Sequence, residues 1–156
     1  MRITAKGHYA VMAMLDLSKQ LPNTAVPLSN ISVRQGIPLP FLEQLFGRLR
    51  KGNLVSSVRG PGGGYKLAKP TKDITIGSIL KTVGEDFSMA ACVNDDDSPA
   101  GNKCKKISEC SVNLLWKRIS RHVSDLTESI NLKDLLEEDQ KYLQKKVMDH
   151  KYQFTI

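Results

Sequence analysis

The chain has 156 residues, of which 40% are hydrophobic and 25% are charged, and its net charge is +7. This length allows one domain with a real core, or one small domain with an appendage. No apolar run approaches the ~18 residues of a membrane span, and Lys6, His8 and Asp16 interrupt the first apolar stretch, which argues against a secretory signal. We therefore expect a cytoplasmic protein.

The positive charge is concentrated in the first half of the chain. Residues 1–81 hold 12 Lys and Arg against 3 Asp and Glu, whereas residues 82–156 hold 11 against 13. A basic half with a folded pattern favours a polyanionic partner, most often nucleic acid. The alternative is an ordinary soluble surface, but such a surface would intersperse acids among the bases.

Three helices are predicted in the first 51 residues. Residues 4–21 carry apolar side chains at spacings of three and four, the last of them Leu21, and Pro22 follows. Residues 28–35 predict a short second helix that Gly36 ends, and Pro40 suits the first turn of a third. The third helix has an inward stripe of Leu42, Leu45, Phe46 and Leu49, and an outward face of Glu43, Gln44, Gly47, Arg48, Arg50 and Lys51.

A glycine-rich run follows between two predicted strands. Four glycines and one proline fill residues 60–64, between the segments "LVSSVR" and "GYKLAK". Such a run builds neither helix nor strand, so it predicts the tip of a β-hairpin. Three short helices and a hairpin have the order of a winged helix-turn-helix, with the helix-turn-helix at about residues 28–51. We expect this DNA-binding domain to span residues 1–84, in a mostly α fold whose β-hairpin is the wing.

The second half predicts helices around a cysteine loop. A fourth short helix covers residues 75–83, and a polar loop that contains "NDDDSPAGN" runs to residue 110. A long helix from Ser111 to about Ile130 has one apolar stripe, formed by Val112, Leu115, Ile119, Val123, Leu126 and Ile130. Residues 136–156 are expected to form a polar, partly helical tail.

The wing and the third helix supply candidate DNA contacts. Arg59 stands at the base of the wing tip, where an arginine can enter a narrow, strongly negative minor groove. Tyr65 and Lys66 can contact the phosphate backbone. On the third helix, Glu43 can accept from a cytosine amino group and Gln44 can pair with adenine. Arg48, Arg50 and Lys51 suit phosphates, and for each charge taken singly a solvated helix face is an equal alternative.

Gly47 lies on the same outward face. A glycine there costs roughly 1 kcal/mol against alanine, and close approach of the helix to DNA would explain that cost.

Two other functions are disfavoured by the motifs. The glycine run is not a nucleotide-binding GxxxxGK[ST] loop, because no Lys-Ser/Thr pair follows it. No Ser-His-Asp, Cys-His or paired-carboxylate arrangement lies in a recognisable motif, so we do not expect an enzyme.

The cysteines point to metal or redox chemistry. Cys92, Cys104 and Cys110 are the three cysteines, and an odd number in a cytoplasmic chain argues against a disulfide framework. Thiolates favour zinc or iron–sulfur clusters, and the absence of paired C-x2-C knuckles makes zinc the weaker choice. Three cysteines leave a four-ligand centre one ligand short. Inert or redox-active thiols are the alternative.

The sequence resembles the winged-helix family of iron–sulfur cluster regulators that includes IscR, NsrR and RirA. The resemblance lies in "MRITAKGHYAVMAMLDL", in "GIPLPFLEQLFGRLRKGNLVSSVRGPGGGYKLAKP", and in three cysteines before "NLLWKRIS", and covers about residues 1–135. It implies a homodimeric regulator of promoter DNA, with cluster-donating proteins as further partners. It also implies that residues 111–135 hold a dimerisation helix, and that the three cysteines bind an iron–sulfur cluster, [2Fe-2S] being favoured over [4Fe-4S].

Two departures from the family pattern concern the cluster. The gap of eleven residues between Cys92 and Cys104 is longer than usual, and it includes Asp95, Asp96 and Asp97. Where IscR carries a histidine ligand after the last cysteine, this chain has Asn113. A neutral amide oxygen is a poor iron ligand.

The fourth ligand is therefore open between Asn113, a solvent ligand, another side chain and a histidine. His122 lies too far along its helix from Cys110, and His150 lies in the tail without apparent constraint. In nitric-oxide-sensing relatives, an early residue of the partner subunit completes the cluster, and His8 occupies that position here. An exposed surface residue is the alternative for His8.

The sequence thus predicts a cluster-controlled DNA-binding regulator that senses iron–sulfur supply, iron, or redox and nitric oxide, acting as a repressor or an activator. A winged-helix regulator without a cluster, controlled by a partner protein or by cysteine oxidation, is the alternative.

Overall fold

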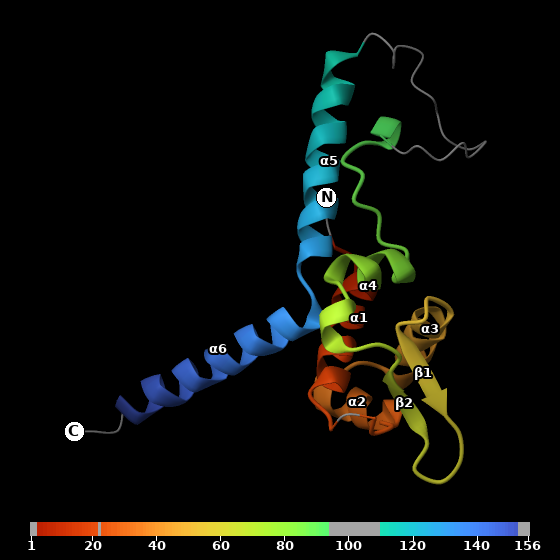
Figure 1. The fold of residues 1–156 in the computed structure, drawn as a ribbon, viewed down its shortest axis with the longest axis vertical. Helices are drawn as coiled ribbons and strands as arrows, with labels where there is room; N and C mark the ends of the chain where they lie inside the picture. Colours follow the sequence, from red (N-terminus) through yellow and green to blue (C-terminus); the bar gives the residue numbers. More distant parts are fainter. Residues whose placement is uncertain (1–2, 22, 94–109, 153–156) are drawn as a thin grey trace.

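The computed structural model describes residues 3–21, 23–93 and 110–152. Its elements follow one another as a helical body, a hairpin and two long helices (Figure 1). The helices are α1 (Ala5–Ser18), α2 (Leu28–Gln35), α3 (Leu39–Lys51), α4 (Ile76–Val83), α5 (Ser111–Ser129) and α6 (Leu132–Tyr152), with 3-10 turns η1 (Thr71–Asp73) and η2 (Ala91–Val93), and the strands are β1 (Val55–Val58) and β2 (Gly64–Leu67). The predicted mostly α fold with a β-hairpin wing is confirmed.

The core of the winged helix forms where α1, α2, α3 and α4 turn their apolar sides inward. The predicted stripe of α3, from Leu42 to Leu49, is buried, and Phe46 is fully covered. Ala10, Ala13, Met14 and Leu17 of α1 are buried as predicted. Leu21 is not part of this face: α1 ends at Ser18, and Leu21 is 78% exposed.

Asp16 fixes α2 against α1. It is buried, and its carboxylate accepts hydrogen bonds from the side chains of Arg34 and Gln35 at the end of α2. The Arg34–Asp16 contact is 2.7 Å long, and the pKa of Arg34 is raised because its guanidinium donates to Asp16. Gly36 then ends α2 in the left-handed conformation, with φ of 64°. The turn of the helix-turn-helix is therefore held by an ion pair between buried Asp16 and exposed Arg34, and by a glycine.

The wing is an antiparallel pair in which Val55 faces Leu67 and Val58 faces Gly64. Val26, which precedes α2, adds a bridge to Tyr65, with both N–H···O distances at 2.9 Å. A Cβ atom on Gly64 would lie 2.3 Å from the carbonyl of Val26. Glycine is therefore required at this position by close backbone approach, and the predicted hairpin is confirmed.

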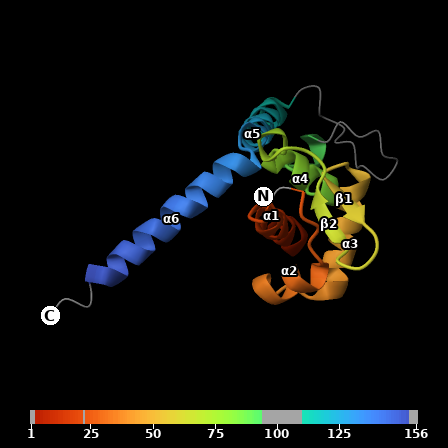
Figure 2. The same cartoon turned by 60° about the horizontal axis from the view of Figure 1, so that its bottom comes forward.

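Helices α5 and α6 extend away from this body, and the two views show α6 leaving it at an angle (Figures 1 and 2). Their junction is nevertheless part of the body, because Leu132 is fully buried in the core and its N–H donates to Ile74 at 2.9 Å. Asn131 begins α6 with a capping box: its side chain accepts from Asp134 N–H, and Asp134 accepts from Asn131 N–H. The tail expected from residue 136 is the continuation of α6, which runs without interruption to Tyr152.

Candidate nucleic-acid interface and cysteine site

The outer face of α3 carries the predicted polar set. Glu43, Gln44, Arg48, Arg50 and Lys51 are all exposed, because the inward stripe fixes the rotation of the helix. Between residues 37 and 72, Glu43 is the single acidic residue among seven Lys and Arg. This face therefore presents positive charge with one carboxylate, as an element that contacts phosphates and bases would.

Gly47 lies half-buried on the same face. Apart from its two neighbours in the chain and the backbone of α3, no atom of the described residues lies within 4 Å of the Cβ that a larger residue would carry there. Packing inside the subunit therefore gives no reason for a glycine at this position.

Arg48 has an internal contact as well as an exposed position. Its Nη1 donates to the carbonyl of Val83, the last residue of α4, at 3.1 Å. This bond satisfies a carbonyl at a helix C-terminus and ties the outer face of α3 to α4. Arg48, for which a phosphate contact is predicted, therefore also has a structural contact within the subunit.

The wing places its predicted residues in different surroundings. Arg59 is exposed at the tip, and Lys66 is half-buried on β2. The ring of Tyr65, also half-buried, packs edge-on against Phe46 with centroids 5.0 Å apart. Tyr65 therefore fastens the wing to α3, whereas Arg59 is available to a ligand.

Two predicted metal ligands lie at the same end of α5. Cys92 belongs to η2, and Cys110 is the residue that precedes the first turn of α5. Both thiols are free and half-buried. Cys104 and the acidic residues 95–97 lie outside the described residues.

Asn113 connects these two cysteines. It is 4% exposed, its Nδ2 donates to the carbonyl of Cys92 at 2.9 Å, and its N–H donates to the carbonyl of Cys110 at 3.1 Å. A second bond, from Met89 N–H to Ser120 Oγ at 3.0 Å, holds the same segment to α5. The main chains of the two described cysteines are therefore both bonded to Asn113 at the start of α5, and soft thiolates suit an iron–sulfur cluster.

The described residues do not complete a metal site. No group of three or more His, Cys, Asp or Glu among them could hold a metal ion. His8 is exposed in the first half of α1 with its ring 5.8 Å from that of Tyr9, and the side chain of His150 lies outside the described residues. The described residues thus supply two cysteines of a proposed site and no complete His, Cys, Asp and Glu ligand group.

Glu85 anchors the beginning of the cysteine segment. Its carboxylate accepts from Thr4 N–H and Gly7 N–H, both at 3.2 Å, and from the hydroxyl of Thr4. Burial alone would raise the pKa of Glu85, but these hydrogen bonds and the charge of Lys6 outweigh it and lower the pKa below 4.5. Glu85 thus acts as a cap on the N-terminus of α1. No local pattern predicts this role, because its partners lie about eighty residues away.

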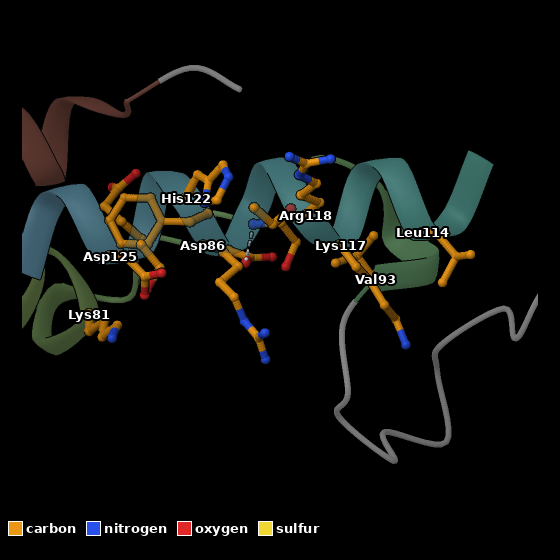
Figure 3. A pocket seen from close by; sticks show the side chains of 14 residues that line it. Lys81, Asp86, Val93, Leu114, Lys117, Arg118, His122 and Asp125 are labelled. Carbon is orange, nitrogen blue, oxygen red and sulfur yellow. Dashed lines mark hydrogen bonds between the residues drawn. The ribbon is translucent and has the colours of Figure 1, made fainter. Parts of the chain in front are cut away.

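A groove of about 1000 Å³ lies between α5 and the segment that leads to Cys92 (Figure 3). Lys117, Arg118 and His122 come from α5, and Asp86 and Val93 come from the opposite wall. Its lining carries both signs of charge. In the described part of the chain no helix is both long and apolar enough to cross a membrane.

Comparison with known proteins identifies the family. The model of the Rrf2 family, described as an iron-dependent transcriptional regulator, matches residues 3–138. The chain belongs to the Rrf2 family. It is 41% identical to the HTH-type transcriptional regulator IscR of Vibrio campbellii over 140 residues, which are 90% of this chain and 80% of that protein. It is 43% identical to IscR of Yersinia pestis over 136 residues, which are 87% of this chain and 79% of that protein.

Two solved structures of regulators have a similar fold. IscR of T. potens superposes with a TM-score of 0.70 at 32% identity, over 91% of this chain and 90% of that one. CymR, the global cysteine regulator of B. subtilis, superposes with a TM-score of 0.70 at 30% identity, over 88% and 98%. The Rrf2-family chain is therefore a transcriptional regulator and not an enzyme.

Proposed function

We propose that this chain is a homodimeric DNA-binding regulator whose promoter binding is controlled by an iron–sulfur cluster. The observation that carries the proposal is the juxtaposition of Cys92 and Cys110 at one end of α5, on the same body as an exposed basic face. Cys92, Cys104 and Cys110 would hold the cluster, [2Fe-2S] being favoured. When bound, it supplies an iron centre whose presence depends on iron supply, redox conditions or nitric oxide.

DNA recognition is assigned to α3 and the wing. Glu43 and Gln44 contact base edges, Arg50 and Lys51 contact phosphates together with Arg48, and Arg59 enters the minor groove. The exposure of these side chains supports the assignment. Lys66 contacts the backbone from β2, and Tyr65 orients the wing by its packing on Phe46.

Homodimerisation is assigned to α5. Val112, Leu114, Leu115 and Leu126 are each at least half exposed in the single subunit. Burying one such side chain is worth about 1.5–3 kcal/mol, so four on one helix favour a second copy of the same helix. The predicted apolar stripe includes three of these four residues.

The fourth cluster ligand is assigned to His8 of the partner subunit. His8 is exposed, and neutral imidazole is a proper iron ligand. Mixed dimers of His8→Ala and Cys110→Ala chains should retain about one intact site per dimer. An unchanged visible spectrum in His8→Ala would remove this assignment and leave the cysteine assignments standing.

Anaerobic purification tests the cluster directly. The protein should be reddish-brown and contain iron and sulfide, and replacement of any one cysteine by alanine should abolish the visible absorbance. Circular dichroism should not change in these variants, because Cys92 and Cys110 lie outside the core. A reconstituted protein that stays colourless contradicts cluster control.

The likeness to CymR favours the second candidate, a regulator without a cluster. A structure of Staphylococcus aureus CymR in an oxidised form has 30% identity to this chain and a TM-score of 0.66. Under this alternative, colourless protein should bind promoter DNA and lose affinity after peroxide treatment, and replacement of the cysteines should remove the response.

A further inference from the structure

The side chain of Asn113 is buried, in a helix whose other residues are not. In α5, whose residues are all described, Asn113 is the single buried residue. A helix that leaves its leucines exposed therefore buries one amide, at its third residue. Burying an unpaired amide costs about 1–3 kcal/mol in proteins, so the hydrogen bond that Asn113 makes has to offset a real penalty.

The acceptor of that hydrogen bond is the main-chain carbonyl of a cysteine. Nδ2 of Asn113 donates to the carbonyl of Cys92 at 2.9 Å, across 21 residues of sequence. Its backbone N–H donates to the carbonyl of Cys110 at 3.1 Å. One residue thus contacts the main chain of both described cysteines, through its side chain on one side and its backbone on the other.

We propose that Asn113 is a positioning residue that holds Cys92 beside Cys110 through its side-chain N–H, and that it is not itself a cluster ligand. This inference rests on the proposed cluster function. Its amide nitrogen is already engaged, and its remaining oxygen is a hard, neutral donor that suits iron–sulfur chemistry poorly. The attachment of the Cys92 main chain to the start of α5 is therefore present in the protein without a cluster.

Asn113→Asp separates the hydrogen bond from the shape of the side chain. The substitution keeps the volume but replaces the donor by a carboxylate that repels the carbonyl of Cys92. A negative side chain in the first turn of α5 suits the helix dipole, so the helix is retained. Asn113→Leu removes the polar group altogether and serves as the second variant. Ser120→Ala is the matched control, because it frees the same segment at Met89 and leaves the carbonyl of Cys92 bonded.

The measurement is the alkylation rate of each cysteine in the full-length, cluster-free chain, followed by peptide mass spectrometry with iodoacetamide. Both Asn113 variants should raise the rate at Cys92 by about two- to tenfold, the factor expected from one net hydrogen bond. The rate at Cys110 should not change, because its contact is with backbone, and Ser120→Ala should raise the rate at Cys92 less. Equal rates at Cys92 in wild type and in Asn113→Asp, with unchanged circular dichroism, would overturn the proposal.

Cluster loss provides an independent measurement. After reconstitution, Asn113→Leu should show the visible spectrum of the wild type and lose its cluster to a chelator about two- to tenfold faster. A shifted spectrum would instead make Asn113 a ligand and refute the inference. A colourless wild type would refute the proposed function alone, since the alkylation result does not depend on a cluster.

Discussion

Replacement of Gly47 by alanine should change folding stability and DNA binding in opposite directions. Gly47 lies within α3 and its φ is not positive. Apart from its two neighbours in the chain and the backbone of α3, no described atom lies within 4 Å of an added Cβ. A glycine in a helix interior costs about 0.5–1 kcal/mol against alanine. Gly47→Ala should therefore stabilise the protein by that amount, or about 1–4 °C in Tm for a chain of this size.

The same methyl group should impair DNA binding. Gly47 lies between Glu43 and Arg50 on the outer face of α3, where the proposed interface requires close approach to the duplex. A cost of about 1.4 kcal/mol is a tenfold loss of affinity, and we expect a loss of about this size for the specific promoter.

Urea unfolding measures the first effect, and fluorescence anisotropy with labelled promoter DNA at fixed salt measures the second. Gln140→Ala, on the exposed side of α6, is the control and should leave DNA binding unchanged. If Gly47→Ala is more stable and binds promoter DNA as tightly as the wild type, then α3 does not come close to DNA and the assignment of the interface is wrong.

Three further predictions follow from the charged groups. Affinity for DNA should fall at least tenfold between about 50 and 200 mM salt because several phosphate contacts release counterions, and a flat response would contradict DNA binding. Arg59→Ala should weaken binding to A·T-rich minor-groove positions more than binding to random DNA. Glu43→Ala should instead relax base preference without weakening binding to random DNA. Competition assays in which both variants lose specific and random binding equally would refute these roles. Glu85→Gln should cost about 1 kcal/mol at neutral pH, the scale of a lost helix cap at a partly exposed site. Because the folded-state pKa of Glu85 is lowered, its stabilisation is present above 4.5 and is lost as the pH falls through the lower value, so the two urea curves should converge in acid.

Local patterns were sufficient to predict the winged helix. The apolar stripe on α3 predicts which side of the helix is buried. It therefore also predicts that the polar residues from Glu43 to Lys51 are exposed, because they lie on the opposite side of the same helix. The glycine run predicted the hairpin, although the need for glycine at residue 64 comes from Val26, a contact that periodicity cannot reveal. Leu21 continues the three- and four-residue spacing of apolar side chains, so the sequence predicts a first helix that reaches residue 21. In the structure α1 ends at Ser18.

The second half of the chain was harder to predict because its determinants are tertiary. A polar composition gave little reason to expect a continuous α6, but the capping box of Asn131 and Asp134 is a sequence signal that marks its start. The contacts of Asn113 and Glu85 join residues 21 and 78 or more positions apart. Nothing in their neighbouring sequence distinguishes them from ordinary surface residues.

These two contacts attach the cysteine segment at both of its ends. At its start, Glu85 is bonded to the N-terminus of α1, and two residues earlier the carbonyl of Val83 is bonded to Arg48 of α3. At its cysteine end, Cys92 is bonded to α5 through Asn113. The segment that leads to Cys92 is therefore bonded at its start to α1, directly after the contact of Val83 with α3, and at its cysteine end to α5, so it lies between the proposed cluster site and the helix proposed to contact DNA.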